Sequence, residues 1–190
     1  VYGLGQYGKV QGLVFDNWKI CPKVPNSPKW KIYGLDFGFT NDPTAVTEVS
    51  FLHGEIWLRE VIYEKRLTNS DISVRLSECK IAKRKMIVAD SAEPKSIEEL
   101  SRKGWNIIGA KKGADSINFG IDLMKQYKIN ITVDSPNLIK EFRTYKYSDK
   151  LNNKGIRQPV DYANHGIDGI RYSLIQQLTQ PSQKAISKAF

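Results

Sequence analysis

The chain has 190 residues, of which 41% are hydrophobic and 26% are charged, as is typical of one globular domain with its own core. Its net charge of +9 favours a polyanionic partner, most commonly nucleic acid. No apolar run approaches the roughly 20 residues that a membrane-spanning helix needs, no secretory signal is visible, and two isolated cysteines, Cys21 and Cys79, argue against a disulfide framework and suit a reducing compartment.

Residues 1–30 contain glycines in a pattern that is similar to a nucleotide-binding loop. The sequence GLGQYGKV at 3–10, followed by DFG at 36–38, matches two protein-kinase motifs. Only 28 positions separate Gly8 from Asp36, too few for a kinase lobe and its catalytic loop, so the kinase interpretation is excluded. We expect instead a short strand over 10–15 and then an extended, proline-rich linker. Because the chain begins at Val1 without a methionine, we also expect it to be part of a longer protein.

Residues 31–63 are predicted to form three strands, at about 31–37, 44–52 and 55–63, with a tight turn at His53-Gly54. Because the connections are short, these strands should be antiparallel neighbours. Asp36 lies near the end of the first strand and has a glycine on each side, two residues away. Taken alone, it is more often an ordinary turn residue than a ligand.

Residues 68–142 alternate between helix and strand. Thr68 and Asp71 form a capping-box pattern for a helix, and Lys80, Lys83, Arg84 and Lys85 crowd its end, either as favourable charges at the helix dipole or as a DNA contact. A buried strand over 86–90 then ends on Asp90, and Pro94 begins the next helix. A strand at 105–109, a helix at 115–127, a strand at 129–133 and a short helix at 136–142 follow. This alternation predicts parallel neighbours, so the complete sheet should be mixed.

Residues 140–158 are irregular and carry a net charge of +4, with two tyrosines among the cations and a hairpin tip expected at 152–155. A solvated loop and a nucleic-acid contact both fit this composition. The candidate DNA-binding residues are Arg143, Lys146, Lys150, Lys154 and Arg157.

The last predicted helix spans about 162–178, and the polar tail at 181–190 is expected to be flexible. Asp161, His165, Asp168 and Tyr172 are spaced by four, three and four residues, so they should form one stripe along a side of this helix.

Three acidic positions suggest a metal centre. Asp36 and Asp90 lie at strand ends, and Asp168 lies in the first turns of a helix that can pack over the sheet. Three carboxylates that converge without lysine or arginine partners would repel one another unless divalent cations neutralise them, and hard oxygen ligands select Mg²⁺ or Mn²⁺. Two such ions would support phosphodiester hydrolysis. His165 is either a further ligand, a residue that orients a water, or a structural histidine.

These motifs resemble the C-terminal nuclease domain of the large terminase subunit of tailed bacteriophages, from about residue 7 to 178. The most specific match is PVDYANHGIDGIRY at 159–172, similar to the family's N-H-x-x-D-A-x-R-Y block, with Gly169 where the family usually has alanine. GLDFG at 34–38 with Asp42-Pro43, and ADSAEP at 89–94, are similar to two acidic motifs of that family. GKVQGLVF at 8–15 is similar to the segment that follows its motor domain.

The resemblance implies an α/β, ribonuclease H-like fold with three antiparallel strands followed by parallel ones. It divides the chain into a post-motor linker at 1–30, a nuclease domain at 31–180 and the tail. Asp36, Asp90 and Asp168 become catalytic metal ligands for Mg²⁺ or Mn²⁺, His165 a further ligand, and Glu93 and Asp161 residues that support them.

The same resemblance implies an endonuclease that cuts concatemeric viral double-stranded DNA during packaging in the host-cell cytoplasm. The implied partners are an N-terminal ATPase motor domain, the portal of the procapsid and the small terminase subunit. No G-x-x-x-x-G-K-[ST] loop occurs here, so this segment should cut DNA without translocating it.

Three other interpretations fit parts of the sequence. An actin-like ATPase would need a second glycine-rich phosphate motif, which the segment after Asp90 does not offer. Resolvases and transposases share the fold but lack the block at 159–172. A non-catalytic DNA-binding or docking module would keep the basic surface but show no metal dependence.

Overall fold

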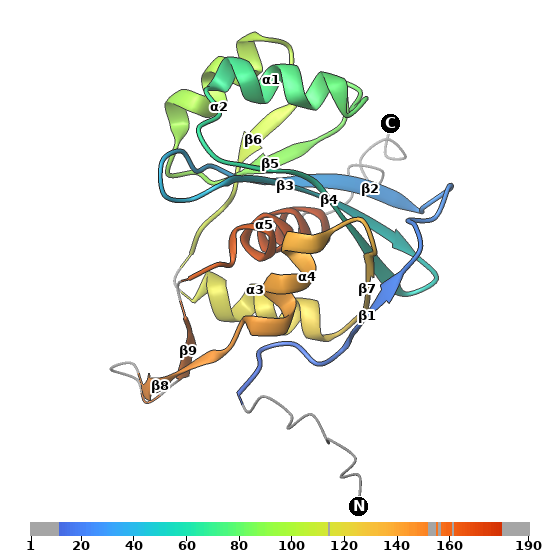
Figure 1. Ribbon diagram of the computed structural model, residues 1–190, viewed down its shortest axis with the longest axis vertical. Helices are drawn as coiled ribbons and strands as arrows, with labels where there is room; N and C mark the ends of the chain where they lie inside the picture. The colour runs from blue at the N-terminus through green and yellow to red at the C-terminus, as the bar shows by residue number, and fades with distance from the viewer. Residues whose placement is uncertain (1–11, 114, 152–154, 156, 161, 180–190) are drawn as a thin grey trace, which may run out of the picture.

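The computed structural model describes residues 12–113, 115–151, 155, 157–160 and 162–179. Its main sheet has seven strands in the order β1-β7-β4-β3-β2-β5-β6, and a separate hairpin pairs β8 with β9 (Figure 1). The strands of the main sheet are β1 (Trp18–Cys21), β2 (Trp30–Asp36), β3 (Thr44–Leu52), β4 (Glu55–Glu64), β5 (Ile87–Ala89), β6 (Ile107–Gly109) and β7 (Lys128–Thr132). The hairpin strands are β8 (Tyr147–Leu151) and β9 (Arg157–Pro159).

The helices form two layers, one on each side of the sheet (Figure 1). On one side lie α1 (Asn69–Glu78) and α2 (Pro94–Arg102), and on the other lie α3 (Ser116–Lys125), α4 (Pro136–Thr144) and α5 (His165–Thr179). Each layer covers its own apolar cluster, and the larger cluster lies beneath α3, α4 and α5. No helix in the described part of the chain is long and apolar enough to span a membrane.

The predicted mixed sheet is confirmed. β2, β3 and β4 are antiparallel neighbours, while β5 runs parallel to β2, and β6 runs parallel to β5. Local sequence signals also account for the starts of two helices. Thr68 and Asp71 form the reciprocal capping box at α1, and Pro94 is the first residue of α2.

The prediction for residues 10–15 was wrong in its described part. Leu13 makes only an isolated bridge to Lys146, and the first strand is β1, which pairs with β7. The apolar run continues into the core, where Phe15 is fully buried against the rings of Phe142 and Tyr145. Side-chain burial, and not strand pairing, therefore explains that run.

The hairpin predicted in the basic segment is present in its described residues, with Gly155 in the left-handed conformation that a tight turn favours. The final helix begins at His165, three residues later than predicted. Asn164 occupies the capping position, where its backbone carbonyl accepts the N–H of Asp168 at 2.8 Å.

Candidate metal centre

Asp36 and Asp90 lie side by side at one edge of the sheet. Leu35 of β2 is paired with Ala89 of β5, and the backbone N–H of Asp90 donates to the carbonyl of Leu35 at 3.0 Å. Both aspartates follow paired residues of adjacent parallel strands, and such strands are only about 4.8 Å apart. The sheet register therefore brings these two carboxylates to the same edge.

Helix α5 approaches that edge because two glycines face each other. A Cβ atom added to Gly34 of β2 would lie 1.8 Å from the carbonyl oxygen of Gly169. One added to Gly169 would lie 3.1 Å from the carbonyl group of Gly34. The backbones of α5 and β2 are thus in direct contact, which places His165 and Asp168 over the end of β2. We call this contact the α5–β2 seam.

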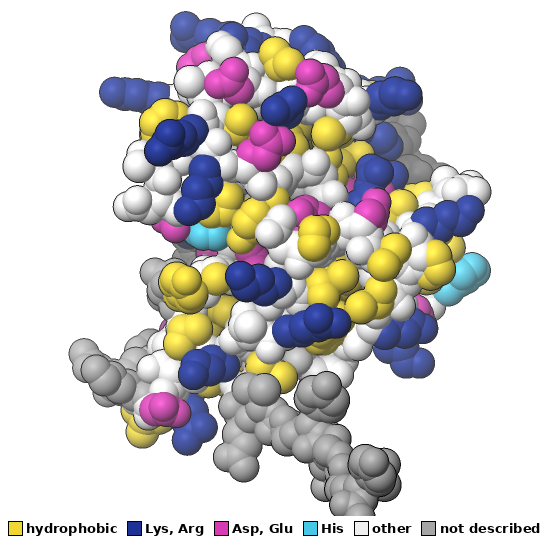
Figure 2. Space-filling view, in the orientation of Figure 1, with side chains coloured by type: hydrophobic (Ala, Val, Ile, Leu, Met, Phe, Trp, Pro, Cys, Tyr) yellow, Lys and Arg dark blue, Asp and Glu magenta, His cyan; other side chains and the backbone are white. Residues whose placement is uncertain are grey.

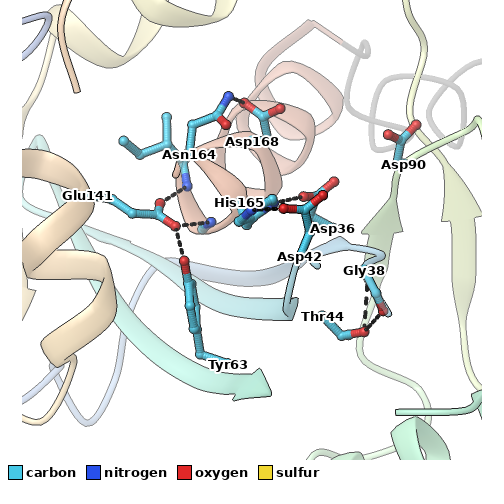
Figure 3. A network of polar contacts seen from close by, with 12 residues as sticks. Asp36, Gly38, Asp42, Thr44, Tyr63, Asp90, Glu141, Asn164, His165 and Asp168 are labelled. Carbon is cyan, nitrogen blue, oxygen red and sulfur yellow. Dashed lines mark hydrogen bonds and ion pairs between the residues drawn. The ribbon is translucent and has the colours of Figure 1, made fainter. Parts of the chain in front are cut away.

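His165 connects two acidic side chains (Figure 3). Its Nδ1 lies 2.9 Å from Oδ2 of Asp36, and its Nε2 lies 3.5 Å from Oδ1 of Asp42. Burial, with further contributions from Asp168 and Asp90, raises the pKa of Asp36 to about 6, although the hydrogen bond to His165 lowers it. The same hydrogen bond to Asp36 raises the pKa of His165. The hydrogen bond therefore couples the protonation of Asp36 to that of His165.

Asp168 is held by two nitrogen-bearing side chains. Its Oδ1 accepts from Nη2 of Arg171 at 2.7 Å and from Nδ2 of Asn164 at 3.2 Å. Arg171 is 3% exposed, and burial works against its charge, yet the charge of Asp168 raises the pKa of Arg171 overall. The arginine of this ion pair is therefore buried, while the side chain of Asp168 keeps 17% of its surface exposed.

Asp90 is more accessible and has a lysine partner. Its Oδ1 lies 2.5 Å from Nζ of Lys112 and accepts the backbone N–H of Ala92 at 2.8 Å. Its Oδ2 accepts the hydroxyl of Tyr172 at 3.4 Å. Burial alone would raise the pKa of Asp90, but the hydrogen bonds from Lys112 and Ala92 outweigh it and hold that pKa below its usual value.

Glu141 is a site residue that sequence reasoning missed. It is 2% exposed, and it accepts the backbone N–H groups of Gly166 and Ile167 at 3.1 and 3.0 Å and the hydroxyl of Tyr63 at 2.8 Å (Figure 3). Burial raises its pKa to about 7, against the lowering effect of these three donors. A glutamate from α4 thus caps the first turn of α5. Its position between Leu138 and Phe142, on the apolar face of α4, was the available signal.

The sequence suggested that the three carboxylates converge without lysine or arginine partners. In the structure, however, Asp90 is paired with Lys112 and Asp168 with Arg171. Asp36, Asp90 and Asp168 are neighbours, but each contacts its own nitrogen-bearing side chain: His165, Lys112 and Arg171. Among the residues that the structure describes, no three His, Cys, Asp or Glu side chains converge closely enough to hold an ion as they stand.

Comparison with known proteins identifies the domain. The family model for the terminase RNase H-like domain matches residues 36–176, which include all three aspartates. This chain belongs to that family. The terminase domain is also 33% identical over 149 residues to the terminase large subunit of Bacillus phage SPP1, and 27% identical over 177 residues to the PBSX phage terminase large subunit of Bacillus subtilis. These matches cover 74% and 92% of the chain, but only 34% and 40% of the two relatives, so it spans well under half of their length.

Solved structures support the same fold. The nuclease domain of the SPP1 large terminase with bound Mn superposes with a TM-score of 0.71 at 24% identity, over 86% of this chain and 98% of that one. The large terminase of a thermophilic bacteriophage in complex with ADP gives 0.73 at 21% identity, over 89% and 46%. The large terminase nuclease from thermophilic phage G20c with bound magnesium gives 0.64 at 18% identity, over 87% and 98%.

The remaining predicted residues of the terminase domain lie outside this cluster or outside the described structure. Glu93 is exposed before α2 and lines a cavity of about 520 Å³ together with Phe37 and Thr68. Arg143, Lys146 and Arg157 are exposed on α4 and around the hairpin. Asp161, Lys154 and the side chain of Lys150 lie outside the described part of the chain.

The distribution of cations does not by itself locate a DNA path. Lysine and arginine side chains are spread over the whole face seen in Figure 2, over α1 and α2 as well as over the lower helices. Lys80, Lys83, Arg84 and Lys85 follow the end of α1. Of these, Lys83 is engaged with the carbonyl oxygen of Lys103 and the ring of Trp105, so it has a structural role.

Proposed function

We propose that this terminase domain is a divalent-metal-dependent endonuclease that cuts concatemeric viral double-stranded DNA during genome packaging. The observation that supports it best is the placement of Asp36, Asp90 and Asp168, from three different elements, around one edge of the sheet. Their mutual repulsion contributes to the raised pKa of Asp36. Such a cluster gains most from a small cation of high charge.

The donor set fits magnesium or manganese in kind, because carboxylate oxygens are the ligands that these ions prefer. Asp36, Asp90 and Asp168 would hold the metal, with His165 as a further contributor. Bound there, two ions would supply the Lewis acidity that activates water and stabilises the leaving oxygen of a phosphodiester.

The protein's own contribution is to hold these groups in position. His165 fixes Oδ2 of Asp36, and the buried Arg171 fixes Oδ1 of Asp168. Glu141 secures the turn of α5 that carries His165. Because the ligands are fixed by contacts within the fold, little of their conformational entropy is left to lose on binding metal or DNA.

For the whole protein we propose an N-terminal ATPase motor domain, with the portal of the procapsid and the small terminase subunit as partners, acting in the host-cell cytoplasm. The support is the length of the relatives, of which this chain spans 34% and 40%, and their names as terminase large subunits. DNA is the proposed substrate of the nuclease domain, in keeping with the net charge of +9.

Cutting of supercoiled plasmid tests the proposal. The domain is expected to nick and linearise plasmid with Mn²⁺ or Mg²⁺, and to leave it intact with a chelator. Asp36→Asn and Asp168→Asn should each lower the rate by about 100-fold or more, because loss of a metal ligand removes several kcal/mol of transition-state stabilisation. Asp134→Asn, at an exposed position after β7, is the matched control and should cut like the wild type.

Intact plasmid at high protein concentration, or cutting that is unchanged in Asp36→Asn, would contradict the nuclease assignment. DNA binding that is independent of metal, without any cutting, would favour the non-catalytic docking module instead. Preference for branched DNA over linear duplex would favour a resolvase-type nuclease.

A further inference from the structure

The three nitrogen partners of the aspartates differ in accessibility. The side chain of Arg171 is 4% exposed and that of His165 is 17% exposed, whereas that of Lys112 is 41% exposed. Arg171 and His165 belong to α5 and are packed into the fold. Lys112 lies in the loop that follows β6, next to Gly113. Of the three, only Lys112 can leave its carboxylate without disturbing the core.

The position of Lys112 is set by the sheet. β5 and β6 are parallel, with Ala89 paired to Gly109, and the N–H of Ala110 donates to the carbonyl of Ala89 at 2.7 Å. The chain therefore leaves β6 at the same edge at which Asp90 leaves β5. Lys112 extends along this edge toward Asp90.

The Lys112 ammonium has two contacts there. Its Nζ lies 2.5 Å from Oδ1 of Asp90 and 5.4 Å from the ring centre of Tyr172. The hydroxyl of the same tyrosine donates to the other oxygen of Asp90. A carboxylate and an aromatic face are both favourable for a cation, so this is a defined cation position beside a proposed metal ligand.

We propose that Lys112 is an exchangeable counter-ion of the metal centre, which competes with the divalent cation for Asp90 and, once displaced, contacts a phosphate of the bound DNA. This inference rests on the proposed nuclease function. Oδ1 of Asp90 already accepts from Lys112 and from Ala92, so an ion that binds this oxygen must displace the ammonium. Two cations at one oxygen would also repel each other.

The chemistry of lysine suits this exchange. Its ammonium is a point charge on a flexible four-carbon stem, with three donors that can turn toward a phosphate. A displaced Lys112 would remain within one side-chain length of Asp90, beside the phosphate to be cut. It would thus keep the metal-free centre charge-balanced and still serve the DNA-bound state.

Calorimetric titration of the domain with Mn²⁺, in the absence of DNA, tests the first part. Lys112→Gln should bind Mn²⁺ about fivefold more tightly than the wild type, since a partly exposed ion pair is worth up to about that factor. Lys112→Arg keeps the charge and should stay within about twofold of wild type. Lys111→Gln removes the same charge one residue away and is the matched control, also expected within about twofold. Unchanged or weaker Mn²⁺ binding by Lys112→Gln would overturn the competition.

Single-turnover cutting at saturating Mn²⁺ tests the phosphate contact. Lys112→Gln should cut about tenfold more slowly or worse, although it holds metal more tightly, and Lys112→Arg should recover most of the rate. A wild-type rate for Lys112→Gln would refute the phosphate contact. If the wild type itself cuts no DNA, the nuclease function fails, while the calorimetric comparison still decides whether Lys112 competes for Asp90.

Discussion

The α5–β2 seam and the exposed cations of the surface differ in how they are held. At the seam, backbone touches backbone at Gly34 and Gly169, and buried Glu141 caps the helix. On the surface lie exposed cations on loops and on the hairpin, namely Lys112, Lys146 and Arg157, which we call the cationic rim. The seam fixes the positions of His165 and Asp168, whereas the cations of the rim are exposed to a ligand in solution.

This difference separates two kinds of mutational effect. Changes at the seam should alter the free energy of unfolding, because they disturb close packing or buried hydrogen bonds. Changes at the rim should leave stability nearly unchanged and alter the affinity for metal or DNA. A rim residue that controls stability, or a seam residue that does not, would break the distinction.

The largest effect is expected at Gly34. Its alanine Cβ would lie 1.8 Å from the carbonyl oxygen of Gly169, so α5 would have to move away from β2. We expect Gly34→Ala to lower the free energy of unfolding by about 3 kcal/mol or more. Gly169→Ala should change it by less than about 1 kcal/mol, because its closest contact is a tight 3.1 Å while alanine is the better helix former within α5. Urea denaturation measures both.

Gly113→Ala is the control for these two variants, because a Cβ at that position meets nothing within 4 Å. It should change stability by less than about 0.5 kcal/mol. Equal stabilities for Gly34→Ala and Gly113→Ala would mean that α5 and β2 are further apart than the structure places them.

The next effect is a pH dependence that originates at Glu141. Its folded-state pKa, about 7, lies above the ordinary value of 4.5, so the folded protein binds the extra proton between these values. Stability must then fall as the pH rises from about 4.5 to 7, by up to about 3 kcal/mol from this group. Glu141→Gln cannot titrate, so the difference in stability between wild type and variant should shift by that amount in favour of the variant over this range.

Urea denaturation of both proteins at pH 5, 6, 7 and 8 measures this shift. Glu98→Gln, on the exposed face of α2, is the matched control. A stability difference between wild type and Glu141→Gln that stays constant with pH would show that Glu141 is ionised throughout, held so by its three donors.

Local sequence signals predicted most of the fold and part of the centre. The alternating strands at 30–64, the capping box at Thr68 and Pro94 each depend on neighbours in sequence, and all three are present. Asp36 and Asp90 were located because each terminates a strand. The family match then supports the identity of the domain, whereas the roles of individual residues stay predictions.

Contacts between distant segments could not be predicted in the same way. Glu141 acts 25 residues away along the chain, on the backbone of Gly166, and no side-chain pattern records a backbone partner. Lys112 was one lysine in a basic turn until the register of β5 with β6 placed it on Asp90. β1 was missed because four residues beside a proline-rich segment give too short a pattern, and its pairing with β7 decides its conformation.

A smaller effect, on affinity alone, is expected at the hairpin. Lys146→Gln combined with Arg157→Gln should weaken binding to duplex DNA about three- to tenfold and reduce the dependence of log K on log salt by about 1 to 2, one for each phosphate that is no longer neutralised. Fluorescence anisotropy over a salt series measures both. Lys95→Gln with Arg102→Gln removes the same charge from α2, across the sheet from the hairpin (Figure 1), and should leave both values nearly unchanged. Equal losses of affinity in the two pairs would mean that only net charge matters, and that the hairpin is a solvated loop.

The smallest effect is expected at Tyr172, where seam and rim meet. Tyr172 belongs to α5 and is 6% exposed, and its hydroxyl reaches Asp90 at 3.4 Å, a long and weak hydrogen bond. Tyr172→Phe keeps the ring beneath Lys112, so Mn²⁺ affinity should change by less than about twofold and stability by less than about 1 kcal/mol. Calorimetry and urea denaturation of this variant, beside Lys112→Gln, separate the two partners of Asp90. If removing the hydroxyl tightened Mn²⁺ binding as much as removing the ammonium, the fixed helix α5 would control the charge of Asp90, and the exchangeable partner would no longer belong to the rim.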